Sequence, residues 1–353
     1  MKRIDEILKY AVEKKASDIH IIANLSPIIR VDGKLVKTTF PPISSQECKE
    51  IVYEILKEEQ IRIFERTKEL DFSYGVEGIG RFRINLHYQK GTIGVSIRFI
   101  KDIIPKFEEL GLPSDVIKRM LSFSYGLILI CGPTGSGKST TLASMVDYLN
   151  ENYPIHIITI EDPIEYTFQH KKAIVEQREL GADTHSFPEA LKRVLRQDPD
   201  VVLIGEMRDK ETIETALRIA ETGHLVLATL HTGEVTQAIG RIVNSFPGEQ
   251  QPIIKTQLSL VLIGIIVQQL IPRLDKRGRV LATEIMVITP AIRSLIREGN
   301  FAQIYSQIQT GGELGMRTMN SSLAFLYKNG LISRDEAFAR SSNLKELKGL
   351  IGM

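Results

Sequence analysis

A glycine-rich segment that follows a short apolar run constrains the fold of this chain more than any other feature. The run covers residues 126–131, and the segment after it reads Gly132, Pro133, Thr134, Gly135, Ser136, Gly137, Lys138, Ser139 and Thr140. Its spacing fits a phosphate-binding loop, in which glycines let backbone N–H groups face a phosphate and a helix starts behind them. We therefore expect a strand at 126–131, a nucleotide-binding loop at 132–139 and a helix at 140–149.

Three more short apolar runs place this loop in a parallel α/β sheet. They cover residues 155–160, 201–204 and 225–229 and lack the polar alternation of half-buried strands, as is typical of strands buried on both faces. The longest apolar run, residues 260–267, is too short to span a bilayer, and we interpret it as a buried helix. The sequence predicts no transmembrane segment, and past about residue 285 its pattern becomes helical and polar.

Acidic residues follow two of the expected strands. Glu161 and Glu165 come after the second run, and Glu206 comes after the third. Because open α/β sheets bind ligands outside the carboxyl ends of their strands, both groups should face the phosphates. One carboxylate would orient the attacking water and another would hold hydrated Mg²⁺, which Ser139 also ligates, while Lys138 reaches the β- and γ-phosphates. The pattern predicts ATP hydrolysis; a purely binding or structural role would leave these acids idle.

Two histidines bracket the last run. His231 lies at its carboxyl end, so this side chain could hydrogen-bond the γ-phosphate or the attacking water. His224 starts the run and would lie farther away. The position of His224 alone leaves a functional and a structural role equally open.

The first hundred residues predict a small α+β unit. We expect an amphipathic helix at 4–12, strands at 17–22, 28–31 and 34–36 with Asp32 and Gly33 as the hairpin turn, a helix at about 45–66, and strands at 81–86 and 93–100. The charges within the first helix exclude a signal peptide. A segment with Pro105 and Gly111 closes the unit as a linker.

Composition indicates an ordinary globular protein of more than one domain. The chain has 353 residues, of which 43% are hydrophobic and 25% charged. A net charge of +2 gives no global field that would favour nucleic acid or an anionic membrane. Cys48 and Cys131 lie too far apart in sequence for a zinc ribbon or a disulfide framework, which favours a reducing cytoplasm.

Together, four segments resemble the Walker A, aspartate-box, Walker B and histidine-box motifs of the secretion ATPases. They are residues 132–139, 160–165, 198–209 and 223–232. The resemblance implies that Glu165 is the leading general base, that Glu206 serves Mg²⁺ and water, and that both His224 and His231 matter. Glu206 stands where most phosphate-loop proteins have Asp at the end of the Walker B strand, but it agrees with this family.

Within the family, three features resemble the ATPases that retract type IV pili. Residues 17–20 and 30–33 are similar to their short N-terminal domain, a four-cysteine zinc insertion is absent, and residues 291–298 resemble the retraction motif with Ser294 in place of Asn. The resemblance implies a PAS-like α+β domain at 1–100, a linker at 101–112, a RecA-like phosphate-loop ATPase domain at 113–288 and a C-terminal helical region at 289–353.

Two arginines of the N-terminal domain enter the expected site through this resemblance. Arg83 and Arg98 occupy neighbouring strands, and the family places such arginines against a nucleotide held by the ATPase domain. At the γ-phosphate an arginine would stabilise transition-state charge. Without the resemblance, two surface arginines on exposed strands are a serious alternative, and Arg81 is the alternative to Arg83.

The implied function is that of a cytoplasmic homohexamer that uses ATP and Mg²⁺ to retract pili. It would associate peripherally with the inner membrane through a pilus platform protein and act indirectly on pilin. A pilus-extension or type II secretion ATPase is the nearest alternative. A RecA-like nucleic-acid motor would share the loop, but near-neutral charge and the lack of tryptophan count against direct nucleic-acid binding.

Overall fold

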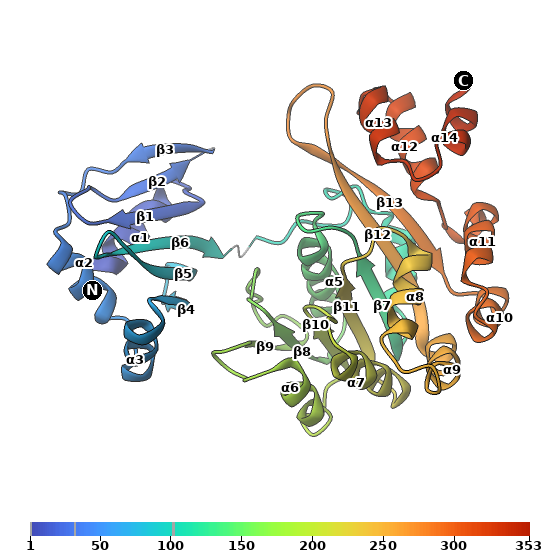
Figure 1. Cartoon of the computed structure of the whole chain (residues 1–353), viewed down its shortest axis with the longest axis horizontal. Coiled ribbons are helices and arrows are strands. Elements are labelled where there is room, and N and C mark those ends of the chain that lie inside the picture. Colours follow the sequence, from blue (N-terminus) through green and yellow to red (C-terminus); the bar gives the residue numbers. More distant parts are fainter. Residues whose placement is uncertain (1, 32, 101–102) are drawn as a thin grey trace. The chain divides into compact units, whose positions relative to one another are not determined.

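The chain divides into two compact units (Figure 1). The computed structural model describes residues 2–31, 33–100 and 103–353. The N-terminal unit comprises residues 1–103 together with 165–167, and the C-terminal unit comprises residues 104–164 and 168–353. Each unit has its own sheet and its own hydrophobic core.

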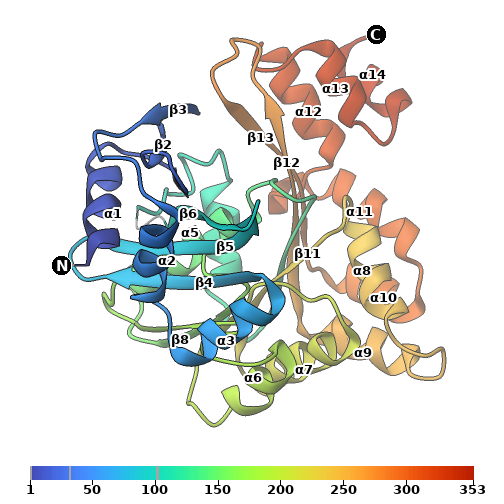
Figure 2. The same cartoon turned by 60° about the vertical axis from the view of Figure 1, so that its left-hand side comes forward.

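The N-terminal unit is a six-stranded antiparallel sheet with helices on one face (Figure 2). Its strand order is β3-β2-β1-β6-β5-β4. The strands are β1 (Asp18–Ile22), β2 (Ile28–Val31), β3 (Lys34–Lys37), β4 (Glu69–Val76), β5 (Gly80–Gln89) and β6 (Thr92–Ile100). Alternate residues such as Ile84 and Ile97 are buried beneath α1 (Arg3–Glu13), α2 (Ser45–Tyr53) and α3 (Glu58–Thr67), so the opposite face carries the polar residues of each strand.

Most of the expected elements of this unit are confirmed, but the helix expected at 45–66 is two helices. α2 ends at Tyr53, and Lys57 is extended, with φ −75° and ψ 156°. The Gln60 side chain accepts a hydrogen bond from the Lys57 backbone N–H at 2.9 Å, which caps the start of α3. β4 was not predicted. The turn residue Asp32 lies outside the described residues, whereas Gly33 has the positive φ of 79° that such a turn requires.

The C-terminal unit contains a seven-stranded sheet in the order β13-β12-β7-β11-β10-β8-β9. The strands are β7 (Gly126–Cys131), β8 (His156–Glu161), β9 (Ile174–Glu179), β10 (Val201–Ile204), β11 (Leu225–Leu230), β12 (Leu262–Pro272) and β13 (Arg279–Val287). All neighbouring pairs are parallel except β12 with β13, which is antiparallel. The four strands predicted from apolar runs are confirmed, and the sheet is mixed rather than wholly parallel.

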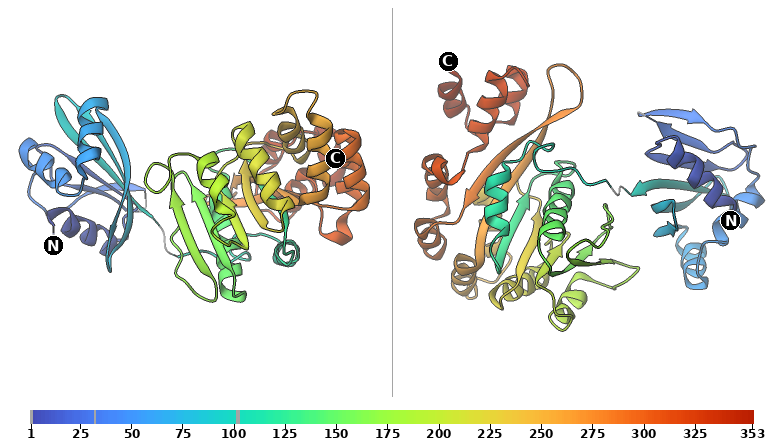
Figure 3. Two further views of the ribbon diagram at one scale, coloured as in Figure 1. Left: turned by 90° about the horizontal axis from the view of Figure 1, so that it is seen from below. Right: turned by 180° about the vertical axis from the view of Figure 1, so that it is seen from behind.

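Helices cover both faces of this sheet (Figure 3). Ile128 and Ile130 of β7 pack with α4 (Ser114–Leu121) and α5 (Lys138–Asn152), while Leu127 and Leu129 belong to the core of the other face. That second face is covered by α6 (Phe187–Val194), α7 (Lys210–Glu221), α8 (Val235–Asn244) and α9 (Gln251–Val261). Successive side chains of a strand point to opposite faces, and because both faces of this sheet are buried, both sets of positions are apolar.

A series of short helices follows β13 and packs on the same core. It comprises α10 (Pro290–Glu298), η1 (Phe301–Gln303), α11 (Ile304–Thr310), η2 (Gly312–Leu314), α12 (Met319–Lys328), α13 (Arg334–Arg340) and α14 (Leu344–Ile351). Ile292, Leu323 and Leu347 are fully buried in the core shared with the sheet. The helical pattern expected past residue 285 is therefore confirmed.

The helix expected at 260–267 is wrong. α9 ends at Val261, and the remaining residues form the first half of β12, which is hydrogen-bonded between β7 and β13. Burial on every side removes the polar alternation that would have identified a strand, and Ile263, Ile265 and Val267 have the β-branched side chains that strands favour.

Among the described residues, no helix is long and apolar enough to cross a membrane.

Candidate functional site

The phosphate-binding loop lies between β7 and α5, where the sequence predicts it. Gly132, Gly135 and Gly137 have positive φ values of 142°, 76° and 91°. A Cβ atom on Gly132 would lie 2.4 Å from the Gln268 carbonyl oxygen and 2.6 Å from Ser136 Oγ. Glycine at 132 is thus required by both backbone conformation and space.

Two side chains of the loop turn inward. Lys138 is only 8% exposed, and its Nζ donates hydrogen bonds to the carbonyl oxygens of Gly132 at 2.9 Å and Pro133 at 3.0 Å. Ser136 is 2% exposed, and its Oγ has no hydrogen-bond partner among the described residues. A buried hydroxyl without a partner is costly, and a phosphate oxygen is a chemically matched acceptor. The loop therefore fits a nucleotide phosphate at the N-terminus of α5.

Strand register brings two of the predicted acids and one histidine to the same edge of the sheet, whereas Glu165 groups with the N-terminal unit. Ile160 of β8, Ile204 of β10 and Ala228 of β11 lie side by side, so Glu161, Glu206 and His231 all follow at the carboxyl ends. Thr229 Oγ1 donates to the Gly205 carbonyl oxygen at 2.5 Å, which links β11 to the segment carrying Glu206.

Glu206 is the centre of the electrostatic network at this edge. Its Oε2 lies 2.8 Å from Arg208 Nη2 and 3.2 Å from His231 Nε2. Burial alone would raise the pKa of Glu206, but the Arg208 hydrogen bond and the charges of His231 and Arg208 hold it below the ordinary value. Glu206 is thus kept ionised, as the carboxylate of a Mg²⁺ or water site must be.

Glu161 and Glu165 have different surroundings. Glu161 is half-buried, and its Oε1 accepts hydrogen bonds from Thr159 Oγ1 at 2.7 Å and Gln177 Nε2 at 3.2 Å. Glu165 is exposed and follows the buried Ile164. The hydrogen-bonded carboxylate of Glu161 has a fixed orientation, which suits a role in orienting water. The exposed carboxylate of Glu165 can bind a water molecule or a neighbouring group.

His224 lies at the opposite end of β11 from His231. Its Nδ1 lies 3.2 Å from both Thr222 Oγ1 and the Ile219 carbonyl oxygen, and its own carbonyl accepts from the Gly126 N–H at the start of β7. The structure therefore does not bring His224 to the phosphate loop of its own chain.

Arg83 and Arg98 lie directly opposite each other on β5 and β6 in the N-terminal unit. Both are exposed on the face of the sheet that carries no helices, whereas Arg81 is partly buried. Arg98 Nε donates to Asp18 Oδ1 at 2.9 Å.

Two cations near the site were missed by sequence reasoning. Arg208 follows β10, and its place two residues after the predicted carboxylate Glu206 is the sequence feature that could have identified it. Arg279 starts β13, and its Nη1 donates to the Gly135 carbonyl oxygen at 3.4 Å. Arg279 could be found only by recognising that 262–287 form a hairpin beside β7.

The described residues contain no group of three or more His, Cys, Asp or Glu side chains arranged to hold a metal ion. Mg²⁺ commonly uses one or two protein ligands and completes its shell with phosphate oxygens and water. Ser139 and Glu206 fit that limited role, because Ser139 lies in the first turn of α5 and the Glu206 carboxylate, whose pKa is held below its ordinary value, lies at the same sheet edge.

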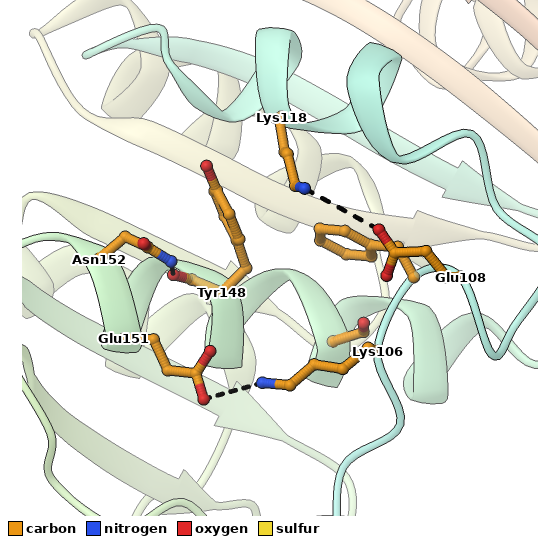
Figure 4. Close-up of a pocket in the computed structure, with 8 residues that line it drawn as sticks. Lys106, Glu108, Lys118, Tyr148, Glu151 and Asn152 are labelled. Carbon is orange, nitrogen blue, oxygen red and sulfur yellow. Dashed lines mark hydrogen bonds and ion pairs between the residues drawn. The ribbon is translucent and has the colours of Figure 1, made fainter.

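A pocket of about 230 Å³ lies away from these residues, along the C-terminal half of α5 (Figure 4). Its lining includes Lys106, Lys118, Tyr148 and Glu151, and none of the predicted site residues. Lys106 Nζ lies 3.0 Å from Asp147 Oδ2 and 2.8 Å from Glu151 Oε1. The ion pairs join the start of the C-terminal unit to α5.

Comparison with known proteins assigns the family. Residues 1–329 match the family described as Type II/IV secretion system protein. The chain belongs to this family. It is 48% identical over 334 residues to the type IV pilus retraction ATPase PilT of Pseudomonas aeruginosa. This match covers 95% of this chain and 96% of that protein. It is 33% identical over 286 residues to the type II secretion system protein E of Xanthomonas campestris, which covers 78% of this chain and 48% of that protein.

A solved member of the Type II/IV secretion system family has the same fold. The crystal structure of the pilus retraction motor PilT with bound ADP matches with a TM-score of 0.90 and 48% identity, over 99% of both chains. The family resemblance drawn from the four sequence motifs is therefore confirmed, together with the mixed α/β fold.

Proposed function

We propose that this chain is an ATP-hydrolysing motor that retracts type IV pili. The observation that carries the proposal is the similarity to PilT, which extends over nearly the whole of both chains. The site supports it, since an ionised Glu206 and His231 lie at the sheet edge that carries the phosphate loop.

Each site residue has a role in this proposal. The loop N–H groups, Lys138 and Ser136 bind the phosphates, and Ser139 and Glu206 hold Mg²⁺, which supplies positive charge to the phosphate oxygens. Glu165 is the leading general base, with Glu161 as its alternative, and His231 contacts the γ-phosphate or the water. Arg83 and Arg98 add positive charge at the γ-phosphate, and His224 acts away from the loop of its own chain.

The larger organisation is also part of the proposal. Residues 1–100 form a PAS-like domain, 101–112 a linker, 113–288 a RecA-like ATPase domain, and 289–353 a helical region with the retraction motif at 291–298. The chain assembles as a cytoplasmic homohexamer held at the inner membrane by a pilus platform protein. ATP binding and hydrolysis move one subunit's N-terminal domain against the ATPase domain of the next, and pilin subunits return to the membrane.

Pilus phenotype tests the direction of the motor. A strain lacking the chain should carry excess pili that do not retract, and it should not twitch. Restoring the chain with Lys138→Ala should leave both defects and abolish ATP hydrolysis in the purified protein. Cells without any pili would instead identify an extension ATPase, and a Lys138→Ala protein that hydrolyses ATP normally would refute the site.

Glu206→Gln separates binding from hydrolysis. The purified variant should still bind ADP but hydrolyse ATP at least about 100-fold more slowly, because the amide cannot carry the negative charge that the site maintains. Stimulation of the unaltered protein's ATPase rate by single-stranded DNA would favour a nucleic-acid motor.

A further inference from the structure

A row of polar side chains crosses the open face of the N-terminal sheet. Arg30 of β2, Asp18 of β1, Arg98 of β6, Arg83 of β5 and Ser73 of β4 lie directly opposite one another on successive strands. Their strand neighbours on the other face, such as Ile84 and Ile97, form the core. The row thus places three arginines and one carboxylate on the face that is free of helices.

Asp18 is the only acid in the row and lies between two of its arginines. Its carboxylate is 2.9 Å from Arg98 Nε and 3.9 Å from Arg30 Nε, and it also accepts a hydrogen bond from Ser17 Oγ at 2.8 Å. The Asp18 side chain is 15% exposed. Burial would raise the pKa of Asp18, but the hydrogen bonds from Ser17 and Arg98 hold it below the ordinary value. The carboxylate therefore stays negative.

The atom by which Asp18 holds Arg98 determines what Arg98 can still bind. The bond uses Nε, so both Nη groups at the end of the guanidinium remain available, and the Arg98 side chain is 70% exposed. Two parallel N–H donors at the end of a planar fork match two oxygens of a phosphate. A contact through the Nη groups would instead have occupied the donors that a phosphate needs.

Asp18 also offsets a repulsion within the row. Arg83 and Arg98 are like charges directly opposite each other on adjacent antiparallel strands, an arrangement that is destabilising. Arg83 has no side-chain partner among the described residues, so the carboxylate on the far side of Arg98 is the compensating charge. Without Asp18, Arg98 would be free to rotate away from Arg83.

We propose that Asp18 is a positioning residue for Arg98, which it holds by Nε so that both Nη groups stay free to bind phosphate oxygens. This inference rests on the proposed function, in which Arg98 acts at the γ-phosphate. It gives the Ser17-Asp18-Ile19-His20 segment a role in hydrolysis that operates through another side chain.

Steady-state ATPase kinetics of the full chain test the inference. Asp18→Asn keeps the shape of the side chain and removes its charge, so kcat should fall roughly tenfold with KM for ATP unchanged, because the arginine is misplaced only where transition-state charge develops. Asp71→Asn is the matched control. Asp71 is an exposed acid on β4 of the same sheet, and its carboxylate accepts a hydrogen bond from Asn85 Nδ2. It should leave kcat unchanged.

A double-mutant cycle separates positioning from any other role of Asp18. In an Arg98→Ala protein, Asp18→Asn should cause no further loss of kcat, because the residue on which Asp18 acts is already absent. Arg98→Lys should be as slow as Arg98→Ala, since one ammonium cannot both pair with Asp18 and present a planar fork. Equal additional losses in both backgrounds, or faster hydrolysis in Asp18→Asn, would overturn the inference.

Failure of the inference and failure of the proposed function give different results. If Arg98→Ala hydrolyses ATP at the normal rate, the proposed role of Arg98 is wrong. If Arg98→Ala is slow but Asp18→Asn is normal, Arg98 stands and the positioning role of Asp18 is wrong. Should Asp18→Asn fail to fold, Asp18→Glu retains the charge but moves it by one methylene; a normal kcat in that folded variant would contradict the positioning requirement.

Discussion

Glu206 and Ser136 represent two ways in which single residues are prepared for a ligand. The negative charge of Glu206 is maintained by Arg208 and His231 despite partial burial. Ser136 instead keeps a buried hydroxyl unpaired beside Gly132. The first arrangement supplies charge, whereas the second stores an unmade hydrogen bond that a phosphate can complete.

Ser136→Ala should therefore have opposite effects on stability and on binding. Removing an unpaired buried hydroxyl should raise the free energy of unfolding of the nucleotide-free protein by about 1 kcal/mol, and ADP should bind roughly fivefold more weakly. Chemical denaturation and titration with a fluorescent ADP analogue measure the two quantities. A variant that is both less stable and unchanged in ADP affinity would show that the hydroxyl is structural.

At the scale of elements, a carboxylate and an arginine each join a helix to its neighbour. Glu284 of β13 is 2% exposed and accepts hydrogen bonds from the backbone N–H groups of Val235 and Met319, the first residues of α8 and α12. In α10, Arg293 Nη1 donates to the carbonyl oxygens of Ser259 and Leu260 near the end of α9. Both use the partial charges of helix ends.

The Glu284 carboxylate should make stability depend on pH. Burial raises its pKa to about 7, and the nearby charges of Glu234 and Glu346 add to the rise. Because the folded-state pKa lies above the unfolded one, the folded state binds the proton more tightly, and stability falls as pH rises from about 4.5 to about 7. Glu284→Gln should remove this part of the slope. Urea unfolding at several pH values measures it, and an unchanged slope would assign the dependence to other groups.

Two arginines of α10, Arg293 and Arg297, should contribute differently to stability. Arg293→Ala should lower the free energy of unfolding by about 1.5 kcal/mol, because α9 loses a charged donor at its end. Arg297 is exposed, so Arg297→Ala should change it by less than about 0.5 kcal/mol. If Arg297→Ala nevertheless abolishes twitching, the outward face of α10 acts in retraction. Deleting 291–298 would also remove the buried Ile292 and Ile296, so single substitutions are the cleaner test.

The sequence pattern predicts elements that a local run of residues identifies, and it fails for contacts that depend on how distant segments pair. The strands β7, β8, β10 and β11 are mainly apolar and buried on both faces, so the sequence predicts them with almost correct bounds. The first half of β12 resembles a buried helix because burial on both faces removes the polar alternation that identifies a strand. The Glu206–His231 proximity followed from strand ends, whereas the Asp18–Arg98 pair depends on the register of strands 80 residues apart in sequence.

At the scale of the whole molecule, each unit has a core drawn from its own residues. The buried N-terminal core uses residues up to Ile97, and the two cores around the larger sheet begin at Phe107 and Leu127. Hydrophobic burial is the dominant stabilising contribution, so each unit has what it needs to fold alone.

A fragment of residues 104–353 should therefore fold and bind ADP. It lacks Arg83 and Arg98, so its ATPase rate should fall at least about 1,000-fold if these arginines act at the γ-phosphate. Circular dichroism, ADP titration and phosphate release check the three statements. Normal hydrolysis by the isolated fragment would exclude a catalytic contribution from the N-terminal unit.

The ion pairs of Lys106 connect α5 to the segment that leads to the other unit. α5 has 15 residues and is about 22 Å long, with the phosphate loop at one end and Asp147 and Glu151 toward the other. An α-helix of this length is stiff, so a change in the direction of one end also moves the other end. Any reorientation that the nucleotide imposes on the loop would reach Lys106 as a displacement, and α5 would serve as a lever between chemistry and the segment leading to the other unit.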